Sequence, residues 1–513
     1  MLVHEFLERS AERLPQKTAI ICGEKRLTYA EFESDANRLA HALLHAGFRR
    51  GDRAIIFLPN SIELAVSIFG VLKAGGVFVI ANPTVKADKL AFMLGDCTAT
   101  AFLSSQSMEA TWRNPVMSAS SLRTCILTGP IDEDALMPGQ QSLERIRQEC
   151  PATRPPNPNI DLDMACLIYT SGSTGEPKGV MSDHSNMVFA ANSIIEYLEN
   201  KDDDIVIDVL PLSFDYGLYQ LIMVVAFGGT LVLERSFAYP AAVLQRIEKE
   251  RVTGFPGVPT IFAVLLRMDL SQFDLSSLRY ITNTAAALPP AHITELSKRF
   301  PSCRIYSMYG LTETKRTLYL PPDQIQHRPE SVGIPIPGTE AWVEDEAGHR
   351  LGPDEVGELV VRGRHVMRGY WGDPVASAER FRPAPIPGER LCYTGDLFRM
   401  DAEGYFYFVG RKDDIIKSRG EKVAPKEVES VIYALEGIRE AAVVGVPDPV
   451  LGEAVKAFVV ADSAEMDERR VIAHCKAHLE DFMVPKYVEV RAHLPKTSSG
   501  KIAKRELVSR EAP

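Results

Sequence analysis

Residues 169–180 combine the residue types that bind phosphate groups. They read Tyr-Thr-Ser-Gly-Ser-Thr-Gly-Glu-Pro-Lys-Gly-Val. Glycines let a backbone approach a ligand closely, hydroxyl side chains donate hydrogen bonds, and Lys178 adds a positive charge. The apolar run before this stretch predicts a buried strand, and Asp183 with the residues after it predicts a helix start. A loop between a strand and a helix presents backbone N–H groups, so the stretch predicts a phosphate site.

The spacing excludes the P-loop of kinase-like and motor-like NTPases. That pattern requires Gly, four residues, and then Gly-Lys-Ser/Thr. Counting from Gly172, this chain has Pro177 at the second glycine position, and Gly179 follows Lys178. A flexible Ser/Gly surface loop is the plainer alternative. The strand expected directly before the loop favours a binding site.

Three further segments carry side chains that could do chemistry. Residues 306–313 read Tyr-Ser-Met-Tyr-Gly-Leu-Thr-Glu and supply an aromatic face, a hydroxyl and a carboxylate close together. Residues 393–396, Tyr-Thr-Gly-Asp, offer a carboxylate that can accept two hydroxyl groups at once. Residues 494–502, Leu-Pro-Lys-Thr-Ser-Ser-Gly-Lys-Ile, carry a lysine near the end of the chain. Alone, these segments would be interpreted as a strand end, a turn and a flexible basic tail.

Together the four segments closely resemble the motifs of AMP-forming adenylating enzymes. That superfamily holds acyl-CoA synthetases, the adenylation domains of nonribosomal peptide synthetases, and firefly-type luciferases. The resemblance covers essentially the whole chain. It implies that a carboxylic acid reacts with ATP·Mg²⁺ to give acyl-AMP and pyrophosphate, and that the acyl group then passes to a pantetheine thiol.

The resemblance also implies roles for individual residues. The phosphate loop would comprise Thr170, Ser171, Gly172, Ser173, Thr174, Gly175 and Lys178. Tyr309 would stack on adenine, Thr312 would contact the α-phosphate, and Glu313 would hold Mg²⁺. Asp396 would bind the ribose hydroxyls with help from Arg411. Lys501 would be the catalytic lysine, which neutralises the approach of an anionic acid to an anionic phosphate.

The acid pocket is expected to begin at Pro211-Leu-Ser-Phe-Asp-Tyr-Gly217. Phe214 stands where many acyl-CoA synthetases have histidine, and Phe214-Asp215 resembles amino-acid-activating domains, whose Asp pairs with the substrate ammonium. Because a buried carboxylate without a partner is costly, we expect an amino acid or another amine-bearing acid. A close alternative is that Asp215 caps a helix beginning at Tyr216.

Rough alignment adds further pocket positions: Tyr219, Pro256, Ile281, Asn283, Met308, Arg316 and Thr317. Arg316 could bind a second carboxylate of the substrate. Pairing with an acid of the protein, or exposure to solvent, is the favoured interpretation.

Alternating strand and helix patterns predict an α/β protein. We expect a large N-terminal domain of stacked, mainly parallel sheets with helices at residues 1–411. A small α/β C-terminal lid domain is expected at residues 412–513. By resemblance, Asp413 is the hinge about which the lid rotates between two half-reactions, and Gly420 would lie near the thiol tunnel. Residues 126–163 are polar and Pro-rich and are expected to form a loop or linker.

The composition of the chain limits the kinds of partner and the cellular setting that we expect. The chain has 513 residues, a net charge of −11 and no long basic run, which argues against nucleic acid as the main partner. The longest apolar run, residues 221–233, is too short to span a bilayer. Eight cysteines without a Cys-x-x-Cys pair favour a cytoplasmic setting.

The favoured function is a stand-alone ligase that activates an amine-bearing acid and loads it onto the phosphopantetheine arm of a carrier protein. The alternative is an acyl-CoA synthetase for a fatty or aryl acid, with coenzyme A as the acceptor. Residues 421–429 resemble acyl-CoA synthetases more closely, and Asn283-Thr-Ala-Ala-Ala replaces a glycine-rich turn, so the acceptor stays open. A catalytically silent binding protein is disfavoured because Lys178, Glu313 and Lys501 are all present.

Overall fold

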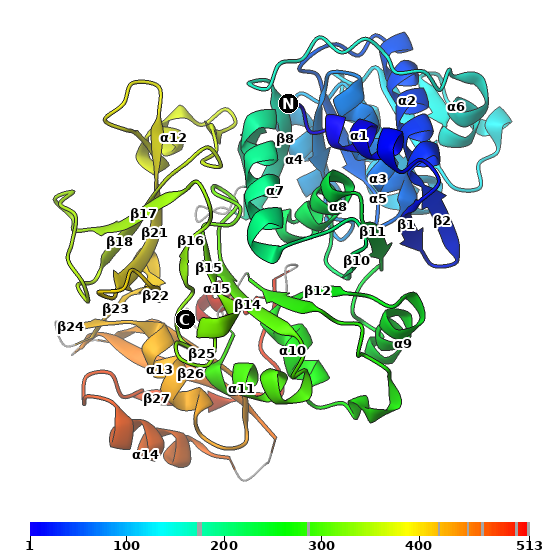
Figure 1. Cartoon of the computed structure of the whole chain (residues 1–513). Coiled ribbons are helices and arrows are strands. Elements are labelled where there is room, and N and C mark those ends of the chain that lie inside the picture. Colours follow the sequence, from blue (N-terminus) through cyan, green and yellow to red (C-terminus); the bar gives the residue numbers. More distant parts are fainter. Residues whose placement is uncertain are drawn as a thin grey trace.

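The computed structural model describes residues 1–171, 177–284, 288–418, 421–448, 451–462, 466–497 and 501–509. Figure 1 shows the blue, cyan and green parts of the chain forming a large body, with a yellow sheet beside it and a small orange-to-red domain below. The predicted α/β class, with a large N-terminal and a small C-terminal domain, is confirmed. The boundary between residues 411 and 412 stays a prediction. No helix within the described ranges is long and apolar enough to cross a membrane.

Helices in the described ranges cover the sheets. They are α1 (Glu5–Arg13), α2 (Tyr29–His45), α3 (Ile62–Lys73), α4 (Ala87–Asp96), α5 (Glu109–Ser118), α6 (Leu143–Glu149), α7 (His184–Leu198), α8 (Asp215–Phe227), α9 (Pro240–Glu250), α10 (Pro259–Leu265), α11 (Pro290–Arg299), α12 (Pro374–Arg380), α13 (Pro425–Tyr433), α14 (Glu468–His478) and α15 (Lys504–Ser509).

Two mainly parallel sheets build the large domain. The order of the first is β19 (Gly369–Tyr370), β9 (Pro177–Asp183), β8 (Met164–Ser171), β4 (Val77–Ile80), β3 (Arg53–Phe57), β5 (Ala101–Ser105), β6 (Thr124–Thr128) and β7 (Gln140–Ser142). The order of the second is β16 (Ile334–Pro335), β15 (Leu318–Leu320), β14 (Arg304–Tyr309), β13 (Tyr280–Asn283), β12 (Gly254–Gly257), β10 (Ile205–Asp208), β11 (Thr230–Leu233), β1 (Thr18–Cys22) and β2 (Lys25–Thr28).

Two smaller sheets follow along the chain. The antiparallel third sheet contains β17 (Glu340–Glu344), β18 (Gly357–Arg362), β21 (Arg390–Met400), β20 (Phe381–Pro383) and β22 (Phe406–Arg411). The fourth lies in the C-terminal domain and contains β24 (Glu421–Val423), β23 (Ile416–Ser418), β26 (Gly452–Ala461), β25 (Ile438–Asp448) and β27 (Tyr487–Val490). The C-terminal domain has its own apolar core, in which Val428, Val443 and Val459 are fully buried.

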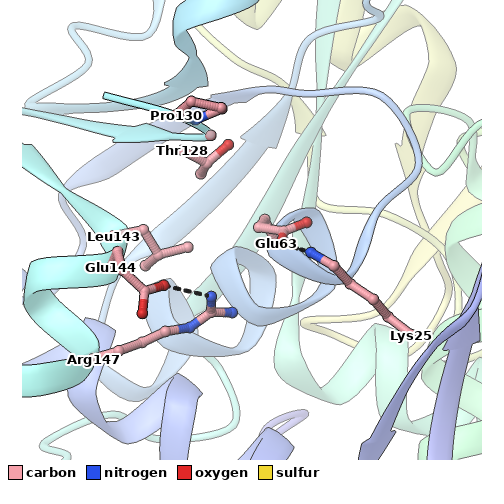
Figure 2. Close-up of a pocket in the computed structure, with 8 residues that line it drawn as sticks. Lys25, Glu63, Thr128, Pro130, Leu143, Glu144 and Arg147 are labelled. Carbon is pink, nitrogen blue, oxygen red and sulfur yellow. Dashed lines mark hydrogen bonds and ion pairs between the residues drawn. The ribbon is translucent and has the colours of Figure 1, made fainter. Parts of the chain in front are cut away.

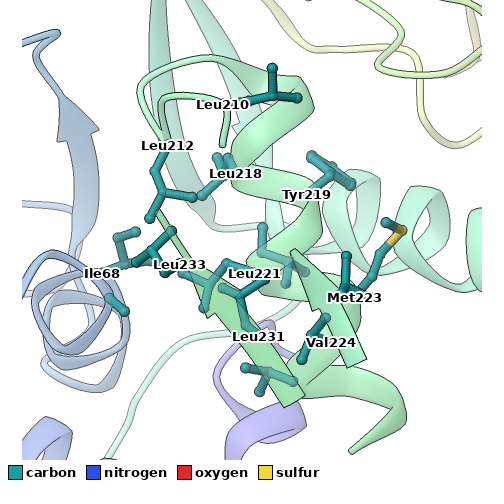
Figure 3. Packing of buried hydrophobic residues seen from close by; sticks show 14 of the residues in the cluster. Ile68, Leu210, Leu212, Leu218, Tyr219, Leu221, Met223, Val224, Leu231 and Leu233 are labelled. Carbon is teal, nitrogen blue, oxygen red and sulfur yellow. The ribbon is translucent and has the colours of Figure 1, made fainter. Parts of the chain in front are cut away.

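Helix α8 packs in the core between the two large sheets. The cluster around it joins Ile56 and Ile168 of the first sheet to Ile207 and Leu231 of the second. Figure 3 shows apolar side chains of α8 beside those of β11, with Ile68 of α3 nearby. The long apolar run at residues 221–233 comprises the end of this buried helix and the strand β11.

Two local expectations were wrong. Residues 126–163 are not only linker, because they contain β7 and α6, and β7 adds a parallel strand beside β6. The chain after the phosphate loop does not enter a helix directly. It forms β9 antiparallel to β8, and α7 begins only at His184. The predicted start signal for α7 is confirmed, since Asp183 and Asn186 form a capping box.

A capping box also begins α2, and its contribution can be tested. The Thr28 side chain accepts a hydrogen bond from the Glu31 backbone N–H, and the Glu31 side chain accepts one from the Thr28 backbone N–H. We expect Thr28→Ala to lower the free energy of unfolding by about 1 kcal/mol. Urea unfolding followed by circular dichroism measures this. Thr28→Ser keeps the acceptor and should match wild type; an alanine variant as stable as the serine variant would contradict the role of the cap.

Candidate active site

The β8–β9 hairpin carries the ends of the predicted phosphate loop. Thr170 pairs with Lys178 across the hairpin, so both lie at the mouth of the loop. Gly172, Ser173, Thr174 and Gly175, and the side chain of Ser171, lie outside the described residues. The Lys178 ammonium is 3.3 Å from the Asp373 carboxylate and stands over the Tyr370 ring at 5.4 Å from its centroid. The lysine therefore comes from a strand and not from the first turn of a helix.

Glu313 is buried, and it contacts Tyr370, the residue whose ring faces Lys178. The Tyr370 hydroxyl donates to Glu313 Oε1 at 2.5 Å, and Arg380 Nε is 3.7 Å from the same oxygen. Thr312 is half-buried beside it. Tyr370 and Arg380 were missed in the sequence analysis. They follow the carboxylate by 57 and 67 positions, in a segment without a recognisable motif, and β19 and α12 bring them back to it.

Asp396 and Arg411 meet because β21 and β22 pair in register at these two residues. The Tyr309 hydroxyl donates to Asp396 Oδ2 at 2.6 Å, and Arg411 Nε is 3.2 Å from Oδ1. Oδ1 has no hydrogen bond within the described part of the chain. Burial raises the pKa of Asp396, while the Arg411 charge and the Tyr309 hydrogen bond lower it. This oxygen is therefore suited to accept a hydroxyl group of a ligand.

Tyr309 has the aromatic surroundings expected of a ring that stacks on a base. Its ring meets Phe398 edge-on at 4.9 Å between centroids and lies 6.4 Å from Phe408. These contacts and the hydrogen bond to Asp396 fix the ring in one orientation. Tyr309, Asp396 and Arg411, predicted from segments about ninety residues apart, are thus brought together in one place.

Lys501 extends from the C-terminal domain toward these groups. Its backbone is fixed by hydrogen bonds with Thr497, at 2.7 Å and 3.2 Å. The residue is exposed. Desolvation of the ammonium lowers the pKa of Lys501, as does the Arg411 charge, whereas Asp215, Asp396 and Glu313 raise it. The lysine therefore lies within electrostatic range of all three predicted carboxylates.

Asp215 and Arg316, both predicted pocket residues, pair with each other. Arg316 Nη1 is 3.4 Å from Asp215 Oδ2, and their side chains are 3% and 20% exposed, respectively. Arg316 also stands over the Tyr216 ring, 4.4 Å from its centroid. The favoured interpretation of Arg316, pairing with an acid of the protein, is confirmed. The capping alternative for Asp215 is wrong, because α8 begins at Asp215 itself and Phe214 occupies the N-cap.

The remaining predicted pocket residues lie deeper. Tyr219 is fully buried on α8, one turn after Asp215, and Asn283 is fully buried at the end of β13. Met308 accepts a hydrogen bond from the Tyr197 hydroxyl through its sulfur at 2.9 Å. Half-buried Phe214 lies at the N-terminus of α8. The sequence analysis missed Lys315, whose ammonium is 5.8 Å from the centroid of the Tyr219 ring.

The predicted hinge falls in a short 3-10 helix, Lys412–Asp414, between β22 and β23. Asp413 is exposed there, and Lys412 is 3.3 Å from Glu358 of the large domain. Gly420 lies outside the described residues. The hinge role of Asp413 stays a prediction.

The carboxylates of this site fit a Mg²⁺ ion whose other ligands would come largely from a bound nucleotide. No group of three or more His, Cys, Asp or Glu side chains in the described residues could hold a metal by itself. Mg²⁺ usually takes one or two carboxylates together with substrate phosphates and water. Glu313 is a buried carboxylate that contacts Tyr370, the residue whose ring faces Lys178, so it would supply such a ligand.

Another concavity lies elsewhere on the large domain. Figure 2 shows this shallow pocket, of about 300 Å³, with Glu63 on one wall and Arg147 on the other. The charged side chains that line it form ion pairs with one another: Lys25 is 3.9 Å from Glu63, and Arg147 is 3.4 Å from Glu144. No predicted site residue lines it.

Comparison with known proteins gives matches along most of the chain. The family model described as AMP-binding enzyme matches residues 7–371, and that described as AMP-binding enzyme C-terminal domain matches residues 427–501. A long-chain-fatty-acid–CoA ligase of Bacillus subtilis is 32% identical, over 99% of this chain and 94% of its own. A feruloyl-CoA synthase of an Amycolatopsis species is 34% identical, over 97% of each chain. Tyrocidine synthase 2 of Brevibacillus parabrevis is 30% identical, over 98% of this chain but 13% of its own length.

Solved structures are also similar to this chain over nearly its whole length. The anthranilate CoA ligase AuaEII in complex with anthranoyl-AMP superposes with a TM-score of 0.91 at 28% identity, covering 99% of this chain and 97% of its own. A benzoate CoA ligase from Burkholderia xenovorans LB400 superposes with a TM-score of 0.87 at 27% identity, covering 99% of both chains.

The contact between Tyr370 and Glu313 gives a test of the site. Tyr370→Phe keeps the ring near Lys178 but removes the hydroxyl that fixes the carboxylate. We expect KM for ATP·Mg²⁺ to rise about tenfold or more, as for loss of one hydrogen bond to a charged group. Steady-state kinetics at varied ATP·Mg²⁺ measures it. Tyr407→Phe, which removes a hydrogen bond to Asp401 instead, is the control; equal KM values for the two variants would contradict the role of Tyr370.

Proposed function

The chain belongs to the family of AMP-binding enzymes and is an AMP-forming acid–thiol ligase, and we propose that its thiol acceptor is coenzyme A. The first half-reaction would join a carboxylic acid to the α-phosphate of ATP and release pyrophosphate. The second would transfer the acyl group to the thiol and release AMP. The observation that carries this proposal is the convergence of Lys501, Glu313 and Asp396 from three distant segments on one site.

Each residue has a task that its contacts support. Tyr309 and Asp396 would hold adenosine, since the ring is fixed by Phe398 and one carboxylate oxygen is available to a ribose hydroxyl. Lys178 would bind phosphate oxygens together with the loop at residues 170–175. Glu313 would hold Mg²⁺, which when bound would withdraw charge from the phosphates. Thr312 and Lys501 would contact the α-phosphate and the attacking carboxylate.

The geometry does not favour an amine-bearing acid. That hypothesis requires an Asp215 carboxylate without a charged partner in the protein. Arg316 Nη1 lies 3.4 Å from Asp215 Oδ2 and already compensates the charge of the carboxylate. A substrate ammonium would therefore meet an arginine beside the carboxylate and be repelled by it. We favour an acid without a free amine, and the resemblance of residues 421–429 to acyl-CoA synthetases supports coenzyme A as its acceptor.

Loading of a carrier protein is the second candidate, and the similarity to Tyrocidine synthase 2 supports it. Both acceptors present the same pantetheine thiol, so the site chemistry does not separate them. Thioester formation would be measured with coenzyme A and with a phosphopantetheinylated carrier protein in parallel. Product with coenzyme A alone supports the first candidate; product with the carrier protein alone would transfer the proposal to the second.

All eight cysteines are free thiols, which supports the expected cytoplasmic setting.

Lys501 provides the direct test of the first half-reaction. We expect Lys501→Ala to slow acyl-adenylate formation on the order of 10²–10³-fold, because a preorganised charge at the reacting phosphate is lost. Rapid-quench measurement of acyl-AMP under single-turnover conditions reports this step alone. Lys496→Ala, which loses only an ion pair with Glu440 on the same segment, is the matched control. Wild-type rates in the Lys501 variant would contradict the proposal.

A further inference from the structure

Lys315 occupies an unusual position in the turn between β14 and β15. Its φ angle is +59°, in the left-handed region that non-glycine residues seldom adopt. The turn is tightly closed, since the Thr317 backbone N–H donates to the Tyr309 carbonyl at 2.9 Å. A side chain at Gly310 would come within 1.8 Å of the Lys315 carbonyl oxygen. The backbone therefore fixes the direction in which Lys315 extends.

The Lys315 side chain extends into the protein. It is fully buried, and within the described residues its ammonium has no hydrogen-bond partner. Its neighbours include the ring of Tyr219 on α8, whose hydroxyl is also buried without a hydrogen bond in the described part of the chain. A buried ammonium without a counter-ion is costly, so this arrangement requires a compensating group.

The nearby carboxylates are already compensated. Asp215 pairs with Arg316 at 3.4 Å, and Glu313 accepts from the Tyr370 hydroxyl at 2.5 Å with Arg380 at 3.7 Å. Lys315 is left as a second cation next to Arg316, against the single carboxylate of Asp215. Within the described residues the Lys315 ammonium thus lacks a hydrogen bond to an anionic oxygen.

The position of this charge relates it to the acid substrate. Lys315 is on the same turn as Glu313 and Arg316, and Tyr219 is on the same face of α8 as Asp215, one turn later. The Asp215 side chain is 20% exposed, whereas Lys315 is fully buried. Asp215 therefore lies on the more exposed side of this cluster and Lys315 on its buried side.

We propose that the Lys315 ammonium and the Tyr219 hydroxyl bind a second anionic oxygen group of the acid, so that the preferred substrate is a dicarboxylic acid. This inference rests on the proposed function, because it assigns the far end of the acid that the ligase activates. One carboxylate reacts with ATP near Lys501. The other supplies the missing counter-ion of Lys315, and its oxygens accept hydrogen bonds from both side chains.

The test compares pairs of acids that differ only in the second carboxylate, such as butyrate with succinate, hexanoate with adipate, and benzoate with a benzene dicarboxylate. Acid-dependent exchange of pyrophosphate into ATP gives kcat/KM for each acid. We expect wild type to prefer the dicarboxylate of at least one pair by about 10²-fold or more, because a site built for a polar group rejects the analogue that lacks it. Lys315→Met should reduce that preference to less than about tenfold.

Controls separate this inference from the proposed function. Lys298→Met, an exposed lysine on α11, should leave the preference unchanged. Lys315→Met should unfold at or above the wild-type temperature, because an uncompensated buried charge is removed. If it fails to fold, Tyr219→Phe replaces it and should lower the preference about five- to tenfold.

Two outcomes would overturn the inference. One is a wild-type preference for the monocarboxylate of every pair, and the other is an unchanged dicarboxylate preference in the variant. In both cases exchange still occurs and the proposed function stands. Absence of exchange with every acid, including long-chain fatty and aryl acids, would overturn the proposed function itself.

Discussion

The site depends on keeping two buried carboxylates close together without mutual repulsion. Glu313 and Asp396 are 7% and 4% exposed; Glu313 lies in the turn between β14 and β15, and Asp396 lies on β21 of the third sheet. Arg380, at the end of α12, lies near both. Although burial opposes its charge, Glu313 and Asp396 both help to raise the pKa of Arg380. Its guanidinium also donates to the Tyr393 carbonyl at 3.0 Å, which fixes it in the third sheet. This arginine ties the carboxylate expected to meet phosphates to the one expected to meet ribose.

The same electrostatics explain how a small C-terminal domain can complete the site. Lys501 belongs to the C-terminal domain. The carboxylates of Asp215, Asp396 and Glu313 in the large domain attract its ammonium, and Arg411 repels it. The contacts between the domains include polar ones, such as the hydrogen bond from Lys426 of α13 to the Phe408 carbonyl of β22 at 3.2 Å. Burial lowers the pKa of Lys426 to about 8. Polar contacts of this kind break more easily than an apolar core, which suits a lid that must rotate between half-reactions.

Much of the fold and of the site could be predicted from the sequence, because the signals were local. The apolar run before residue 169 and the start signal at Asp183 predicted β8 and the beginning of α7. Tyr309, Asp396 and Lys501 could be proposed because each lies in a short segment with several characteristic residues. The loop at residues 172–176 and the hinge role of Asp413 stay predictions.

The failures concern pairings that the residue pattern does not show. β9 was not foreseen because nothing in Lys178-Gly-Val-Met indicates that this stretch pairs back on β8 in a hairpin. The partner of Asp215 follows it by 101 positions, so a search along the sequence suggested a substrate ammonium instead of Arg316. Lys315 was missed because nothing in the local sequence shows that its backbone is left-handed and directs its side chain inward.

The central claim is that this one site forms an acyl-adenylate before any thiol takes part. Incubation of the protein with ATP, Mg²⁺ and an acid panel in the complete absence of thiol, followed by mass spectrometry of the enzyme-bound products, tests it most directly. We expect an acyl-AMP species and released pyrophosphate that depend on the acid. AMP or thioester that appears only when thiol is added, with no acyl-AMP for any acid, would contradict it.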